Sequence, residues 1–211
     1  MADWFRRKTW TKTDEEEFFV KLERARKDGR AQYLKIQAIE LIETNEPELL
    51  KIAETLLNKM LTEYPDDNFN RSSALHSLGD IYRQFGNFVQ AIIYYRQALD
   101  FEKVYPKVTT QAYLDYSELV IKSGHTDYFD QVESILLNRQ MNILFPIEKY
   151  KVNSILSIIN NYKNKPDRAK YFADLADQNA NEETSGLKYH KYLGVVTNRD
   201  TWLDKLARKK N

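Results

Sequence analysis

The chain has 211 residues, 42% hydrophobic and 30% charged, a composition that fits one soluble globular domain with a sizeable core and excludes a disordered chain. Its 32 basic and 31 acidic side chains leave a net charge of +1, so no global electric field attracts nucleic acid or an anionic membrane. The absence of cysteine excludes disulfides, thiolate metal sites and cysteine nucleophiles.

No segment of the sequence has the apolar character of a secretion signal or a membrane anchor. The N-terminal residues lack a long apolar run, and no stretch approaches the roughly 20 apolar residues that span a bilayer. The lack of cysteine also fits a reducing compartment. We therefore expect a cytoplasmic protein with no membrane partner.

Apolar residues recur at three- and four-residue steps along most of the chain, and this periodicity predicts an all-α fold. Thr13 is expected to start the first helix in a capping box with Glu16, and Gly29 to end it. Pro47 is expected to open the third helix. The predicted helices cover residues 13–29, 31–43, 47–64, 72–85, 88–103, 108–123, 127–141, 147–163 and 166–180.

Three predicted turns recur at a nearly constant interval, which indicates a repeated helical hairpin. Gly86, Gly124 and Asn164 each lie between two helices, 38 and 40 residues apart. In the hairpin around Gly86, small residues are expected to let the two helices approach while large aromatic ones fill the groove beside them. The residues of this pattern are Leu75, Leu78, Gly79, Tyr82, Ala91, Tyr95 and Ala98.

These residues resemble the tetratricopeptide repeat family, although Leu75 replaces the family's tryptophan and the terminal proline comes late, as Pro106. The resemblance implies a single-domain, right-handed α-solenoid of antiparallel helix hairpins with capping helices at both ends. About four hairpins are expected in residues 31–180, with the best repeat at 72–105. The N-terminal segment and capping helix then occupy 1–30, and the C-terminal capping helices occupy 181–211.

The resemblance also implies a non-enzymatic module that binds a partner protein or peptide in the concave groove of the solenoid. An adaptor, an escort and a neutralising inhibitor of the immunity type all fit this role. A solvent-exposed helix face would carry the same polar residues, so both interpretations of the predicted groove stay open. The strong repeat contributes Ser73, His76, Asp80, Arg83 and Gln84, and alignment through Gly124 adds Gln111, Leu114, Glu118 and Lys122.

Two other classes of function compete with partner binding. Basic and aromatic residues in 4–10 and a basic C-terminal tail are the basis for an alternative, an RNA-binding regulatory solenoid. Because DEEE follows at once, we expect Trp4, Phe5 and Trp10 to pack onto the first helices instead. His76 and Asp80 are spaced for a general base, but no nucleophile motif or phosphate loop accompanies them, so we expect no enzyme and no cofactor. His76, His125 and His190 are far apart in the sequence and form no ligand-spaced cluster, so we expect no metal site.

Overall fold

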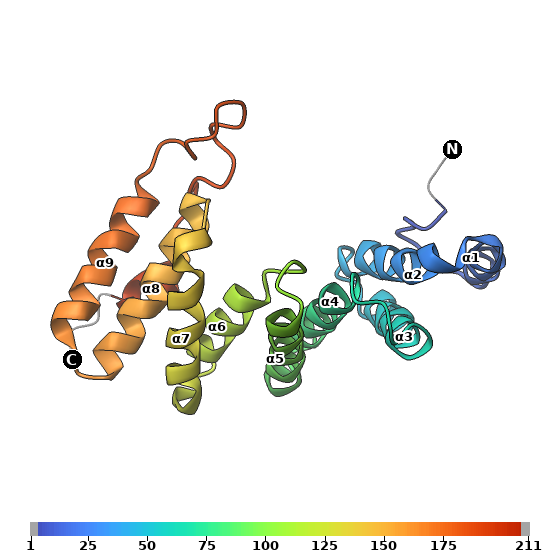
Figure 1. Cartoon of the computed structure of the whole chain (residues 1–211), viewed down its shortest axis with the longest axis horizontal. Helices are drawn as coiled ribbons and strands as arrows, with labels where there is room; N and C mark the ends of the chain where they lie inside the picture. The colour runs from blue at the N-terminus through green and yellow to red at the C-terminus, as the bar shows by residue number, and fades with distance from the viewer. Residues whose placement is uncertain (1–3, 208–211) are drawn as a thin grey trace. The chain divides into compact units, whose positions relative to one another are not determined.

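The computed structural model describes residues 4–207, apart from the side chain of residue 141 (Figure 1). The described residues form ten α-helices and two short 3-10 helices and no strand, so the predicted all-α class is confirmed. The helices are α1 (Lys12–Arg24), α2 (Lys27–Ile42), α3 (Pro47–Glu63), α4 (Arg71–Gln84), α5 (Phe88–Val104), α6 (Ala112–Lys122), η1 (Thr126–Tyr128), α7 (Phe129–Arg139), η2 (Gln140–Asn142), α8 (Pro146–Tyr162), α9 (Pro166–Ala180) and α10 (Thr201–Ala207).

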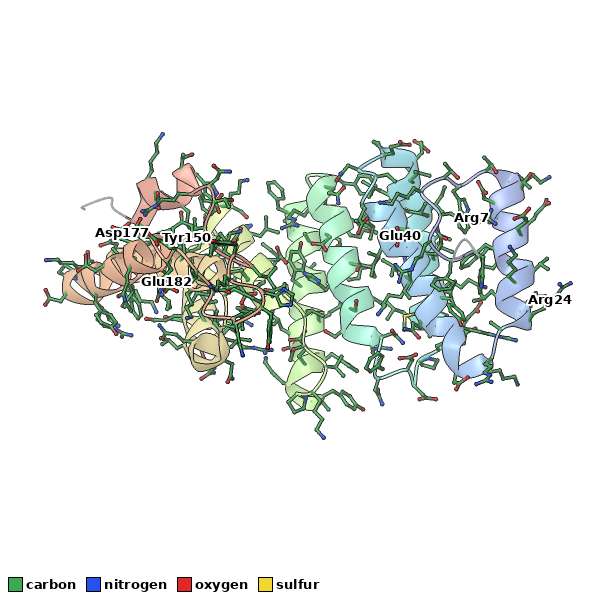
Figure 2. The ribbon with its side chains drawn as sticks, turned by 90° about the horizontal axis from the view of Figure 1, so that it is seen from above. Arg7, Arg24, Glu40, Tyr150, Asp177 and Glu182 are labelled. Atoms are coloured by element: carbon green, nitrogen blue, oxygen red, sulfur yellow. The ribbon has the colours of Figure 1, made fainter. Side chains whose placement is uncertain are left out.

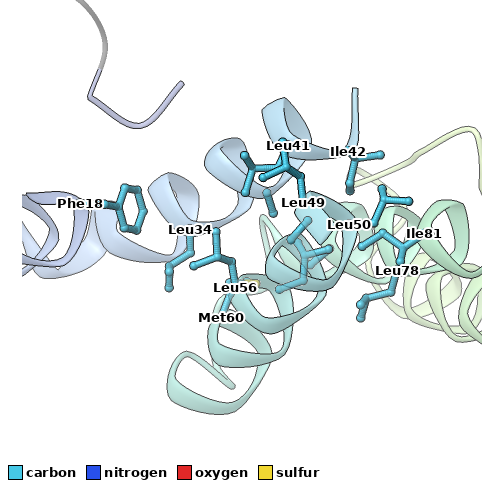
Figure 3. Close-up of a cluster of buried hydrophobic side chains, with 14 of the residues drawn as sticks. Phe18, Leu34, Leu41, Ile42, Leu49, Leu50, Leu56, Met60, Leu78 and Ile81 are labelled. Atoms are coloured by element: carbon cyan, nitrogen blue, oxygen red, sulfur yellow. The ribbon is translucent and has the colours of Figure 1, made fainter. Parts of the chain in front are cut away.

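The chain forms two compact units, the first ending at Ala112 and the second beginning at Tyr113. In the first unit, α2 packs along α3 and α4 packs along α5. Apolar residues of α1, α2, α3 and α4 meet in one continuous cluster (Figure 3). The buried members labelled in that view are Phe18, Leu34, Leu41, Ile42, Leu49, Leu50, Leu56, Met60, Leu78 and Ile81.

The N-cap of the first helix lies two residues earlier than predicted. Thr11, not Thr13, is the N-cap: its hydroxyl accepts from the Asp14 amide at 3.2 Å, and the Asp14 carboxylate accepts from the Thr11 amide at 2.8 Å. The two possible capping boxes overlap in the sequence, and Arg7 binds Asp14, which favours the earlier one. Arg7, which lies outside the helix, therefore helps to set the start of α1.

The end of the first helix was also predicted wrongly. The backbone leaves the helical region at Ala25, and Gly29 lies inside α2. Arg30 of α2 donates to the carbonyl of Ala25 at 3.1 Å and to the carbonyl of Glu23. An arginine side chain thus satisfies the last carbonyls of α1, a role that the sequence analysis assigned to a glycine.

Four helix pairs are joined by turns that contain a residue with positive φ, and three of these turns are the predicted ones. A residue two or three positions after the end of the first helix of each pair has a positive φ, between 54° and 74°. Glycine and asparagine tolerate this left-handed backbone better than other residues. The four positions are Asn45 between α2 and α3, Gly86 between α4 and α5, Gly124 between α6 and α7, and Asn164 between α8 and α9.

In three of these turns the amide after the left-handed residue closes the same backbone hydrogen bond. It donates to the carbonyl five residues earlier, the bond that terminates a helix in a Schellman motif. The pairs are Asn87 with Tyr82, His125 with Val120 and Lys165 with Asn160, at 2.9 to 3.1 Å.

Each pair also carries a small buried residue at one fixed position, seven residues before its left-handed turn residue. A small side chain at this place lets the backbone of the second helix come close. In the last pair, the Ser157 hydroxyl donates to the carbonyl of Ala169 on α9 at 2.8 Å. The four small residues are Ala38, Gly79, Ser117 and Ser157.

The second unit is built around α8, which packs on α9 and α10 and is buried on every face from Val152 to Asn160. Two of its buried asparagines donate hydrogen bonds to side chains of the same unit. Asn153 donates to Asn179 at 3.0 Å, and Asn160 donates to Glu133 at 3.1 Å. Burial alone would raise the pKa of Glu133, but Lys163, Asn160 and Arg168 outweigh it and lower that pKa.

The C-terminal part contains less helix than predicted. Between Asn181 and Asp200 the chain forms turns and bends, and only Thr201–Ala207 is helical among the described residues of 181–211. Arg199 fixes this segment to α9 and α10, because it binds Asp177 and donates to Asp204 at 2.8 Å. Tyr150 of α8 also donates to Asp204, at 3.0 Å.

None of the helices within residues 4–207 combines the length and the apolar character that crossing a bilayer requires.

Candidate partner-binding site

The five candidate residues of the strong repeat lie along α4 in the first unit. Their spacing of three or four residues places Ser73, His76, Asp80 and Arg83 in neighbouring turns of the helix. Ser73, His76 and Asp80 are half-buried, whereas Arg83 and Gln84 are exposed. The buried side of the same helix carries Leu75, Ala74, Leu78 and Ile81.

Tyr95 of α5 contacts two of the candidate residues, His76 and Asp80. Its ring is completely buried, its hydroxyl donates to the Asp80 carboxylate at 2.7 Å, and the His76 ring lies 5.5 Å from its centroid. Arg83 donates to the same Asp80 oxygen at 3.2 Å. Asp80 is therefore oriented from two sides, which reduces the rotamer entropy it loses when it meets a partner group.

Gly79 makes this arrangement sterically possible. A Cβ at position 79 would overlap the Cδ1 and Cε1 atoms of the Tyr95 ring, and it would lie 3.0 Å from Cζ. The ring instead packs on the bare backbone of α4 beside Ala91, which is fully buried. The alternation of small and large residues in the sequence thus corresponds to the packing of Tyr95 on Gly79. This packing places the Tyr95 hydroxyl next to the Asp80 carboxylate.

Tyr82 ties α4 to the preceding hairpin, a contact that the sequence analysis did not foresee. Its hydroxyl donates to Glu54 of α3 at 2.5 Å, and its ring stacks on Tyr94. The hydrogen bond to the Glu54 carboxylate, with burial, raises the pKa of Tyr82 to about 12. The repeat pattern identified Tyr82 as a packing residue, but no local signal identifies its partner 28 residues earlier.

In the second set of candidate residues, three of the four are buried or contact other side chains of the second unit. Gln111, at the end of the first unit, is exposed. In the second unit, Leu114 is buried, Glu118 pairs with Lys151 of α8 at 2.8 Å, and Lys122 lies over the Trp202 ring of α10. Burial raises the pKa of Glu118, and Lys151 opposes that rise. Elements α8 and α10 thus contact the α6 side chains that were expected to meet a partner.

The N-terminal residues pack as expected onto the first helices. Trp4 lies 5.3 Å from Phe18 and 5.0 Å from Tyr33, and Trp10 lies 5.3 Å from Phe18, measured between ring centroids. Buried Gln37 fixes the segment further, because it accepts from the Arg7 amide at 3.0 Å and donates to the Arg7 carbonyl at 2.7 Å. Residues 4–10 therefore lie against α1 and α2.

Acidic partners neutralise the basic residues of this segment. Arg6 pairs with Glu40 at 2.8 Å and Lys8 with Glu43 at 3.0 Å, while Arg7 binds both Asp14 and Glu17 (Figure 2). These pairs point the cationic groups toward the protein's own carboxylates. Arg6, Arg7 and Lys8, on which the RNA-binding alternative rests, are thus each paired with a carboxylate.

The sequence matches no protein-family model, and comparison with curated proteins and with solved structures yields no match.

Proposed function

We propose that this chain is a non-enzymatic protein-binding module whose partner docks on α4, at Ser73, His76, Asp80, Arg83 and Gln84. The observation that carries the proposal is the pre-oriented pair of opposite charges formed by Asp80 and Arg83 above the buried Tyr95 ring. A fixed charge pair favours a partner with complementary charges, because misaligned partners place like charges together. The partner segment is therefore a polar helix or strand that carries both an acid and a base.

We further propose that the hairpins form a right-handed, tetratricopeptide-like solenoid. The shared turn geometry at Asn45, Gly86, Gly124 and Asn164 supports a repeated unit. The small buried residue seven positions before each turn supports it as well. In such a fold the first helix of each hairpin lines the concave surface, which places α4 where a partner binds. Acting as an adaptor, an escort or a neutralising inhibitor, the chain works through binding alone.

The experiment compares Arg83→Glu with the wild-type protein in affinity capture from the native cell, with bound proteins identified by mass spectrometry. We expect Arg83→Glu to lose one stoichiometric partner, because the reversal places two carboxylates side by side on the binding face. Lys51→Glu is the matched control, since Lys51 pairs with Glu48 at the same three-residue spacing on α3. Equal capture by all three proteins contradicts the α4 site.

A further inference from the structure

The turn-rich segment between α9 and α10 contains a closed loop, here named the tyrosine loop, residues 186–193. The Ser185 amide donates to the Lys191 carbonyl at 2.7 Å, and the Ser185 hydroxyl donates to the His190 carbonyl at 2.8 Å. These bonds join Ser185, directly before the loop, to His190 and Lys191 within it, and the Leu193 amide donates to the His190 carbonyl at 3.0 Å, so internal hydrogen bonds define the backbone of the loop.

Gly194 anchors the loop to the second unit. Its carbonyl accepts from the Ile147 amide at 2.8 Å, and its φ is +71°. A Cβ at this position would lie 2.6 Å from the Phe145 side chain, so only glycine fits between the loop and the start of α8. The loop is therefore a defined surface feature and not a loose connection, and Figure 1 shows it leading away from α9.

The tyrosine loop exposes large apolar groups that contribute little to the fold. All eight of its residues are exposed, with Tyr189 at 82%, Tyr192 at 76% and Leu193 at 54%. Leu187 adds a fourth large side chain. A local concentration of exposed aromatic and aliphatic side chains on an ordered backbone marks a binding surface.

Positive charge surrounds these apolar groups. Lys188 and Lys191 directly precede Tyr189 and Tyr192, and the sequence contains no aspartate or glutamate from Thr184 to Arg199. The Lys188 ammonium lies 5.2 Å from the centroid of the Tyr189 ring. The surface is thus complementary to carboxylates placed around an apolar group.

We propose that the tyrosine loop is a second protein-binding surface, which takes a segment of a partner protein that combines acidic residues with aliphatic or aromatic ones. The proposal rests on the proposed function, that this chain acts by binding proteins. Tyrosine provides rigid, amphipathic contact area at low entropic cost, and a preordered backbone lowers the cost of binding further.

The side chains favour a protein over the other two classes of partner. Leu187 and Leu193 offer no ring for a nucleic-acid base to stack on, although two tyrosines are present. Recognition of an anionic membrane by a basic cluster typically uses about four to eight lysines or arginines, and this loop has two lysines. A protein partner uses the leucines, the tyrosines and the lysines together.

The test selects random peptides displayed on phage against the full-length protein, and then measures synthetic versions of the enriched peptides by fluorescence polarisation. Two variants remove the surface in different ways: Tyr189→Ser with Tyr192→Ser, and Lys188→Glu with Lys191→Glu. Tyr171→Ser, an exposed tyrosine of α9, is the control, and circular dichroism verifies that every variant is folded.

We expect enriched peptides that combine aspartate or glutamate with leucine or aromatic residues, and whose affinity falls at least about tenfold in both loop variants. Tyr171→Ser and Arg83→Glu should bind them as the wild type does. Enrichment of no loop-dependent peptide overturns the proposal. Peptides whose binding is lost only with Arg83→Glu overturn the tyrosine-loop proposal while supporting the α4 site. Failure of the loop proposal is thus distinguishable from failure of the proposed function.

Two further probes separate the other classes of partner. Vesicles of phosphatidylcholine with phosphatidylserine and an oligouridine RNA are each titrated with the wild type and the loop variants. We expect no binding that depends on the loop. Loop-dependent binding of either probe, in place of the acidic peptides, assigns the surface to lipid or RNA and overturns the protein partner.

Discussion

At Gly79, the packing of Tyr95 outweighs the low helix propensity of glycine. In an unhindered helix, Gly→Ala stabilises by about 1 kcal/mol. At position 79 the added Cβ would overlap two atoms of the completely buried Tyr95 ring. Overpacking of this kind costs about 1 to 3 kcal/mol, so the steric penalty equals or exceeds the helical gain. The same contact positions the Tyr95 hydroxyl on Asp80.

We therefore expect Gly79→Ala to lower the free energy of unfolding, and to weaken capture of the α4 partner, because it displaces Tyr95. Urea denaturation measures the first effect. Gly29→Ala in α2 is the control, since its Cβ would lie 3.3 Å from the edge of the half-buried Tyr33 ring. This control should be neutral or stabilising, and a Gly79→Ala variant that behaves in the same way would show that the ring accommodates a methyl group.

At the scale of the element, Asp14 joins the N-terminal residues to the start of α1. Hydrogen bonds from the Thr11 amide and hydroxyl, together with Arg7, lower the pKa of Asp14 from 3.8 to about 2. A lowered carboxyl pKa means that the folded state favours the ionised form. The resulting stabilisation is fully present above about pH 4, and it is lost as the pH falls toward 2.

Asp14→Asn should therefore be less stable than the wild type at pH 7, and the difference between the two proteins should shrink as the pH falls from 4 to 2. Thr11 remains the N-cap, and the amide oxygen of asparagine can still accept from the Thr11 amide, so the variant isolates the charge. Urea denaturation at several pH values measures both proteins. Glu16→Gln is the control, because its exposed carboxylate lies 4.0 Å from Lys12. A difference that stays constant with pH would contradict the assignment to Asp14.

Local features of the sequence predicted most helices and turns, and long-range contacts explain what was missed. Apolar periodicity and left-handed turn residues such as Gly86 and Gly124 act within a few residues, so sequence reveals them. The Thr11 cap depends on Arg7, and the contacts of Glu118 and Lys122 depend on α8 and α10. The position of the cap and these side-chain contacts are determined by tertiary packing, which cannot be predicted from a local sequence pattern.

The tyrosine loop illustrates the same limit in a different way. A solenoid end was expected to need helices over residues 181–211, so the segment was predicted by analogy and not from its own residues. Gly186 and Gly194 both adopt positive φ, which interrupts a helix. The exposed Tyr189 and Tyr192 were visible in the sequence, but only the closed backbone shows that they stand on an ordered surface.

At the scale of the whole molecule, each of the two units has its own core. Leu57 is fully buried in the first unit, and Ile155 is fully buried in α8 of the second. The division into two compact units predicts two cooperative units of unfolding. Truncating a buried leucine or isoleucine to alanine typically costs about 2 to 5 kcal/mol.

Leu57→Ala should therefore accelerate hydrogen exchange in α2 to α5 while leaving α8 and α9 unchanged, and Ile155→Ala should do the reverse. Native-state exchange measured by mass spectrometry resolves the two regions in the full-length protein. Lys103→Glu, an exposed substitution on α5, controls for nonspecific effects. If either core substitution accelerates exchange equally throughout residues 4–207, the two units unfold together. The α4 site and the tyrosine loop then belong to one cooperative fold. In that case, binding at one surface stabilises the other.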